Sequence, residues 1–164
     1  MSHETSRDAP KAGDLALDFT LYSHTQSSWQ LSENRDKPVV LLFFPGAFTS
    51  VCTNELHRAN NESEFLDNAH VVGISTDSPF ALSKYQEQEG FDFPLLSDHS
   101  AEVAARYGSK YDQNFTRMEL DRIAKRSAFV IDQDGVIRYA EVLENAGKHP
   151  DFEAIEATVQ ELVS

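Results

Sequence analysis

Cys52, the only cysteine in the chain, is the residue best suited to act as a nucleophile. It follows an apolar run at 39–44 and a Pro45-Gly46 turn, and it lies where a helical pattern begins. A helix N-terminus exposes free N–H groups and a positive dipole end, which favour thiolate over thiol. Thr49 is the expected N-cap, with its hydroxyl able to bond the Cys52 backbone N–H and approach the sulfur. The alternative, a small buried hydrophobe, stays open on residue type alone.

A wider pattern surrounds this cysteine. Pro45, Thr49 and Cys52 reproduce the Pro-x-x-x-Thr-x-x-Cys signature of peroxiredoxins, so the chain resembles these thiol peroxidases of thioredoxin-like fold. Segments 93–98 and 126–132 are similar to the family segment after the second helix and to its arginine-bearing strand. The pattern is closest to the one-cysteine, AhpE-like branch of this alkyl hydroperoxide reductase/thiol-specific antioxidant family. Because a resolving cysteine is absent, an internal disulfide mechanism is excluded.

The resemblance implies a role for each matching position. Cys52 would attack the peroxide, and Arg126 would supply a permanent positive charge to sulfur and oxygen. An ordinary thiol is only a few per cent ionised at neutral pH, and a helix terminus contributes only about 0.3–1 kcal/mol, so such a cation is needed. Thr49 would share a hydrogen bond between thiolate and peroxide, and Pro45 would shield the sulfur. Glu55, which orients the arginine in several relatives, is carried over as supporting only, because a glutamate in a helix's first turns is commonly a surface charge.

These features predict a peroxidase that reduces hydrogen peroxide or organic hydroperoxides through a Cys52 sulfenic acid and is regenerated by an external thiol or redoxin. Two alternatives remain: a peroxide-sensing redox relay without significant turnover, and a non-catalytic thioredoxin-like interaction module. The resemblance also implies a homodimer. The chain lacks nucleotide-binding glycine motifs, and its six histidines show no metal-ligand spacing. We therefore expect neither a cofactor nor a metal.

Composition bounds the remaining possibilities. A chain of 164 residues with 40% apolar residues fits one domain. We expect a flexible N-terminal arm at 1–12 and a thioredoxin-like peroxiredoxin domain at 13–164. The net charge of −13 argues against nucleic-acid partners, and it suits either a solubilising surface or a salt-adapted organism. Without a membrane-length apolar run or a signal-peptide pattern, we expect no membrane partner and a cytoplasmic location.

The order of elements predicts an α/β fold with a thioredoxin-like central mixed sheet and helices on both faces. We expect strands at 17–22, 29–31, 39–44, 70–75, 94–96, 127–131 and 136–143. The expected helices run from Thr49 to about Leu66, from the turn at 77–79 to Gly90, over 101–107, and from an Asp151 cap to Leu162. The polar stretch 109–125 is expected as a surface excursion. Each of Phe48, Phe80 and Phe115 is expected in the core, with a dimer contact as the alternative.

Overall fold

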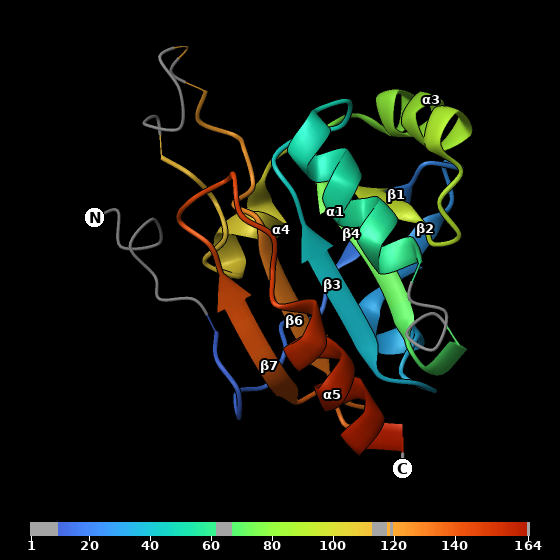
Figure 1. Cartoon of the computed structure of the whole chain (residues 1–164), viewed down its shortest axis with the longest axis vertical. Helices are drawn as coiled ribbons and strands as arrows, with labels where there is room; N and C mark the ends of the chain where they lie inside the picture. Colours follow the sequence, from blue (N-terminus) through green and yellow to red (C-terminus); the bar gives the residue numbers. More distant parts are fainter. Residues whose placement is uncertain (1–9, 62–66, 113–117, 119, 164) are drawn as a thin grey trace.

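The computed structural model of the chain describes residues 10–61, 67–112, 118 and 120–163. In these ranges, seven strands form one sheet in the order β2-β1-β5-β4-β3-β6-β7 (Figure 1). The strands are β1 (Thr20–Ser23), β2 (Ser28–Gln30), β3 (Val39–Phe43), β4 (His70–Ser75), β5 (Leu95–Ser97), β6 (Ser127–Ile131) and β7 (Ile137–Val142). Strand β4 runs parallel to β3 and β5, and the other pairs are antiparallel. The sheet is mixed, as predicted.

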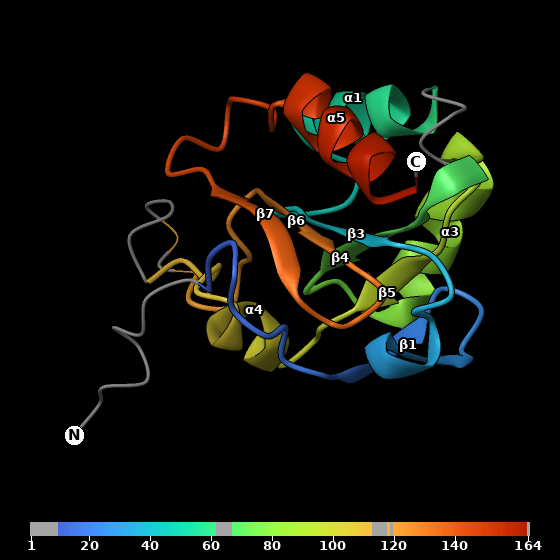
Figure 2. The same cartoon turned by 90° about the horizontal axis from the view of Figure 1, so that it is seen from below.

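Helices cover both faces of this sheet. They are α1 (Ser50–Asn60), α3 (Pro79–Glu89), α4 (Glu102–Arg106) and α5 (Phe152–Val163), and a short 3-10 turn, η2 (Leu31–Glu33), follows β2. Figure 2 shows α1 and α5 side by side on one face and α4 on the other. This arrangement agrees with the predicted two-sided covering of the sheet.

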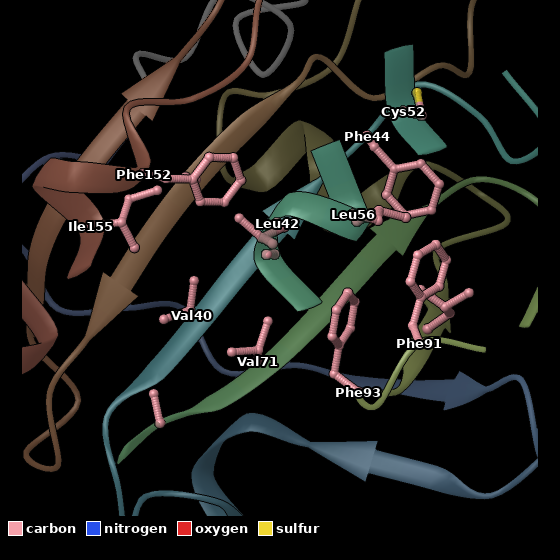
Figure 3. Packing of buried hydrophobic residues seen from close by; sticks show 14 of the residues in the cluster. Val40, Leu42, Phe44, Cys52, Leu56, Val71, Phe91, Phe93, Phe152 and Ile155 are labelled. Atoms are coloured by element: carbon pink, nitrogen blue, oxygen red, sulfur yellow. The ribbon is translucent and has the colours of Figure 1, made fainter. Parts of the chain in front are cut away.

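The central strand β3 explains why its sequence is apolar at every position. Val40 and Leu42 belong to the hydrophobic cluster that α1, α3 and α5 cover, part of which is drawn in Figure 3. Val39, Leu41 and Phe43 belong to the cluster on the face that α4 covers. Because successive side chains of a strand point to opposite faces, a strand buried on both faces needs an apolar residue at each position.

The ends of α3 and α5 follow the sequence signals closely. The Ser78 side chain accepts a hydrogen bond from the Ala81 backbone N–H at 3.2 Å, and Gly90 ends α3 in the left-handed conformation with φ of 71°. The Asp151 carboxylate accepts one from the Ala154 backbone N–H at 3.1 Å, which caps α5. Side-chain caps and a terminal glycine satisfy the free backbone groups of helix ends.

The end of α1 differs from the prediction. The helix ends at Asn60, not near Leu66. Asparagine is a weak helix former because its amide competes for backbone groups outside the helix. Here the Asn60 side chain accepts a hydrogen bond from the Asp92 backbone N–H at 2.7 Å. Residues 62–66 lie outside the described ranges.

Two further predictions concern aromatic residues and the N-terminal arm. Phe48 and Phe80 are 51% and 70% exposed, so placing them in the core was wrong. Phe48 lies in the loop before α1, where one side of its ring contacts the buried Tyr85, and Phe80 lies in the first turn of α3. Phe115 lies outside the described residues, as does most of the expected arm at 1–12, which stays a prediction. Among the described residues, no helix has the length and hydropathy needed to cross a bilayer.

Candidate active site

Cys52 lies in the first turn of α1, at the end of the hydrophobic cluster nearest the carboxyl end of β3 (Figure 3). Its side chain is 1% exposed, yet it lines an open pocket of about 520 Å³. Pro45 and Thr49 line the same pocket, and so does Arg126. The fold therefore brings together the four positions that the sequence singled out as catalytic candidates. The thiol lies beside open space and is not enclosed on all sides by apolar side chains.

Each of the three guanidinium nitrogens of Arg126 donates a hydrogen bond, and together these bonds hold the group beside the sulfur. It directly precedes β6 and is 1% exposed. Its Nη2 donates to Cys52 Sγ at 3.3 Å, and its Nη1 donates to Glu55 Oε1 at 2.5 Å. The Ala146 carbonyl accepts from Nε at 3.1 Å and from Nη2 at 2.8 Å. These four bonds fix the planar fork in one orientation, with one edge toward the sulfur.

Glu55 is completely buried and not at the surface. Burial raises the pKa of its carboxyl to about 7, although the charge of Arg126 acts in the opposite direction. Burial alone would lower the pKa of Arg126, but the charges of Glu55 and Cys52 outweigh that effect and raise it. Within the described part of the chain, Glu55 Oε2 has no hydrogen-bond partner. One cation thus faces two acidic groups, and all three side chains are almost completely buried.

The shifted carboxyl makes folding stability depend on pH. Because the folded pKa of Glu55, about 7, exceeds its ordinary value of 4.5, the folded state keeps a proton that the unfolded chain releases between these values. The stabilising contribution is complete below the ordinary value and is lost as pH rises through the folded value. We expect Glu55→Gln to reduce the fall in melting temperature between about pH 5 and 8, where each kcal/mol corresponds to about 2–4 °C. Thermal unfolding over this range measures it.

The control for this prediction is Glu153→Gln, which removes the same charge from an exposed position in the first turn of α5. It should leave the slope of melting temperature against pH close to that of the parent. If Glu55→Gln also gave the parent's slope, Glu55 would not be the group that titrates in the folded protein.

Thr49 occupies the predicted N-cap position but makes a different hydrogen bond. Its backbone is extended, with φ of −98° and ψ of 147°, as an N-cap requires. Its hydroxyl donates to the Gly46 carbonyl at 3.0 Å and makes no cap bond, so the predicted bond with the Cys52 N–H was wrong. The left-handed φ of 66° at Phe48 turns the chain tightly there. The Gly46 carbonyl consequently lies within reach of the exposed hydroxyl.

The other walls of the pocket come from segments far apart in sequence. Thr76 and Asp77 follow β4, while Ala146 and Gly147 follow β7. Reasoning from the sequence overlooked the Ala146 carbonyl, because a backbone acceptor leaves no side-chain signal. It also treated 77–79 only as a helix start. Since β3 and β4 are parallel, residues after both strands meet at one sheet edge, and this rule could have identified Asp77.

Within the described ranges, no group of three or more histidine, cysteine, aspartate and glutamate side chains could hold a metal ion. The pocket offers a thiol beside a fixed guanidinium, with hydroxyl and backbone groups around them.

Comparisons with known proteins agree with this geometry. A family model described as the AhpC/TSA family matches residues 12–140. The thiol peroxidase of Oceanobacillus iheyensis is 35% identical over 146 residues, covering 88% of this chain and 85% of that protein. The crystal structure of peroxidoxin BcpB from Mycobacterium tuberculosis is 36% identical, with a TM-score of 0.79 over 94% of this chain and 99% of that chain.

A more distant structure extends the comparison of folds. The peroxiredoxin-like protein from Aquifex aeolicus has a TM-score of 0.84, covering 95% of this chain and 90% of that chain. At 22% identity, this similarity shows the fold alone. Together with the mixed sheet and its two layers of helices, it confirms the predicted thioredoxin-like architecture.

Proposed function

Because the chain belongs to the AhpC/TSA family, the peroxiredoxins, we propose that it reduces hydroperoxides at Cys52 with electrons from an external thiol. The observation that carries this proposal is the 3.3 Å contact between Arg126 Nη2 and Cys52 Sγ at the wall of an open pocket. A buried guanidinium stabilises a thiolate and the negative charge that develops on a peroxide oxygen. Similarity to thiol peroxidases favours turnover over a relay or a non-catalytic module.

In the oxidative half-reaction, the Cys52 thiolate attacks one peroxide oxygen and the O–O bond breaks. Two electrons leave the sulfur, which becomes a sulfenic acid, and the other oxygen takes up a proton and leaves as water or an alcohol. Arg126 lies beside the sulfur and offers donors to the oxygens. Thr49 and Pro45 line the entry, where the hydroxyl can bond the peroxide and the proline ring excludes water.

In the reductive half-reaction, an external thiol attacks the sulfenic sulfur, which releases water and leaves a mixed disulfide. A second thiol attacks that disulfide, which restores the Cys52 thiol and releases the oxidised reductant. Glu55 and the Ala146 carbonyl act on neither partner directly. We assign them the role of holding Arg126 in place throughout both half-reactions.

Intact-mass spectrometry of the reduced protein tests this cycle. After one equivalent of hydrogen peroxide, we expect a monomer that has gained one oxygen and is trapped by a sulfenic-acid reagent. A small thiol should convert this species to a mixed disulfide, because the chain holds no second cysteine. Stopped-flow oxidation should be much faster than that of free cysteine.

Three results would contradict the proposal. Oxidation as slow as that of free cysteine would favour the interaction module, and a dominant covalent dimer would mean that a second subunit supplies the resolving sulfur. Fast oxidation without steady-state consumption of peroxide in the presence of thiols would instead favour the redox relay.

The proposal includes a homodimer and a cytoplasmic location. Phe48 in the loop before α1 and Phe80 in the first turn of α3 are both exposed. Packing these rings against a second copy of the chain would remove apolar surface from water. Sedimentation velocity at several concentrations tests the homodimer, with Phe80→Ser expected to weaken the association.

The proposed cytoplasmic location suits the single thiol. A reducing compartment such as the cytoplasm would return this thiol to its active state between turnovers.

A further inference from the structure

We propose that Asp77 is a positioning residue for peroxide reduction, because its carboxylate fixes the loop at 45–49, which lines the pocket together with Cys52. This inference rests on the proposed function and adds a residue to it. We call residues 45–49 the thiol loop. The loop carries Pro45 and Thr49, and it leads directly into α1.

A single oxygen of Asp77 joins the thiol loop to the sheet. Asp77 Oδ2 accepts a hydrogen bond from the Ala47 backbone N–H at 2.8 Å and another from the Ser75 hydroxyl at 2.7 Å. The Ser75 hydroxyl oxygen also accepts from the Asp77 backbone N–H at 3.3 Å. The carboxylate is thus held by the last residue of β4 and in turn holds the loop that follows β3.

The backbone of residues 75–77 is itself fixed by hydrogen bonds from the end of β5. The Ser97 hydroxyl, at the end of β5, donates to the Asp77 carbonyl at 2.7 Å. The Asp98 backbone N–H donates to the Ser75 carbonyl at 2.7 Å. The Asp77 carboxylate therefore projects from a rigid sheet edge, which is the kind of support that holds a reactive loop in one position.

The thiol loop has a conformation that needs such support. Phe48 has a φ of 66°, in the left-handed region that a bulky residue rarely adopts, and this conformation persists only when its surroundings hold it. The Phe48 ring lies 4.9 Å from that of Tyr85, but more than half of it is exposed. The bond from Ala47 to Asp77 comes directly before this residue and restrains the turn at its start.

Two walls of the pocket are therefore anchored separately. Arg126 is fixed on one wall by Glu55 and the Ala146 carbonyl. The thiol loop forms another wall and is fixed by Asp77, which also lines the pocket. A peroxide bound between them must meet sulfur, guanidinium and hydroxyl in one alignment, and a small displacement of one wall removes that alignment.

Stopped-flow oxidation of Asp77→Ala and Asp77→Asn by hydrogen peroxide separates the hydrogen bonds from the charge. Asp77→Ala should lower the oxidation rate constant by about tenfold to 10²-fold, because it frees the thiol loop. Both hydrogen bonds converge on one oxygen, so an asparagine carbonyl in that place can accept both. Asp77→Asn should therefore stay within about threefold of the parent.

Alkylation of Cys52 by iodoacetamide provides the readout that a purely structural role would not produce. This electrophile needs the thiolate but not the peroxide alignment, so Asp77→Ala should alkylate at close to the parent rate. Ser32→Ala is the matched control, because it removes a serine-to-aspartate hydrogen bond of the same kind, from Ser32 to Asp18 at 2.9 Å, at residues that do not line the pocket. It should oxidise at the parent rate.

Ser75→Ala provides a second test that does not depend on the folding of Asp77→Ala. It removes one bond to the carboxylate and should slow oxidation several-fold while leaving alkylation unchanged. Three results would overturn the inference: parent-like oxidation of both Asp77→Ala and Ser75→Ala, equal losses in oxidation and alkylation, or an Asp77→Asn variant as slow as Asp77→Ala. If the parent itself oxidised no faster than free cysteine, the proposed function would fail instead.

Discussion

Cys52→Ser is expected to abolish peroxide reduction while leaving the fold nearly intact. A serine hydroxyl is not ionised at neutral pH and cannot form a sulfenic acid, and the chain contains no other cysteine. The substitution exchanges one small side chain for another, and the Arg126 donor that faces the sulfur can still bond an oxygen there. Hydroperoxide consumption with an excess of thiol should fall to the level of the thiol alone.

Thermal unfolding and circular dichroism provide the control for this variant. A melting temperature close to that of the parent would assign the loss to chemistry and not to unfolding. Residual turnover above a few per cent of the parent rate would contradict the assignment of Cys52 as the nucleophile.

Substituting Arg126 is expected to have the next largest effect. Arg126→Lys keeps a charge but loses the planar fork that reaches Cys52, Glu55 and the Ala146 carbonyl together. We expect the rate constant for Cys52 oxidation to fall on the order of 10²-fold, comparable with the loss of one preorganised donor to a developing oxyanion. Arg126→Ala should lose more, and it should also lower the thiolate absorbance at neutral pH. Stopped-flow oxidation and ultraviolet absorbance measure the two effects.

The Arg126→Ala variant needs a matched partner because it leaves a buried carboxyl without its cation. Removing one member of a buried pair costs about 3–5 kcal/mol, which could unfold the variant and imitate a catalytic loss. The double variant Arg126→Ala/Glu55→Gln removes both charges and should recover part of the melting temperature without recovering the oxidation rate. Unchanged oxidation in Arg126→Lys and in the double variant would remove Arg126 from the reactive site.

The architecture and the central thiol could be predicted because local patterns carry them. The continuous apolar run at 39–44 identified a strand buried on both faces, and Ser78, Gly90 and Asp151 marked helix ends. These signals depend on residues close in sequence. The resemblance to peroxiredoxins then identified Arg126, which no local pattern would place 3.3 Å from a sulfur 74 residues away.

The details that were missed depend on backbone geometry or on contacts between distant segments. The Thr49 hydroxyl bonds Gly46 because Phe48 adopts a left-handed φ, which sequence patterns do not predict for phenylalanine. The Ala146 carbonyl is a backbone group, and its residue type has no bearing on its ability to accept from Arg126. Phe80 lies in the first turn of α3 and is exposed. Its hydrophobicity alone could not predict this, because apolar residues also occur on protein surfaces.

Because Arg126 contacts both Cys52 and Glu55, the oxidation state of the sulfur is coupled to the protonation of a carboxyl group that does not contact the substrate. Glu55 contacts Arg126 but does not line the pocket, and its raised pKa of about 7 places its titration near neutrality. When a Cys52 thiolate becomes a neutral sulfenic acid, the guanidinium has one negative neighbour fewer, so ionised Glu55 becomes easier to accommodate. Oxidation of the sulfur therefore promotes proton release from Glu55, and re-reduction promotes its return. By linkage, the proton occupancy of this carboxyl must in turn bias the redox equilibrium of the sulfur.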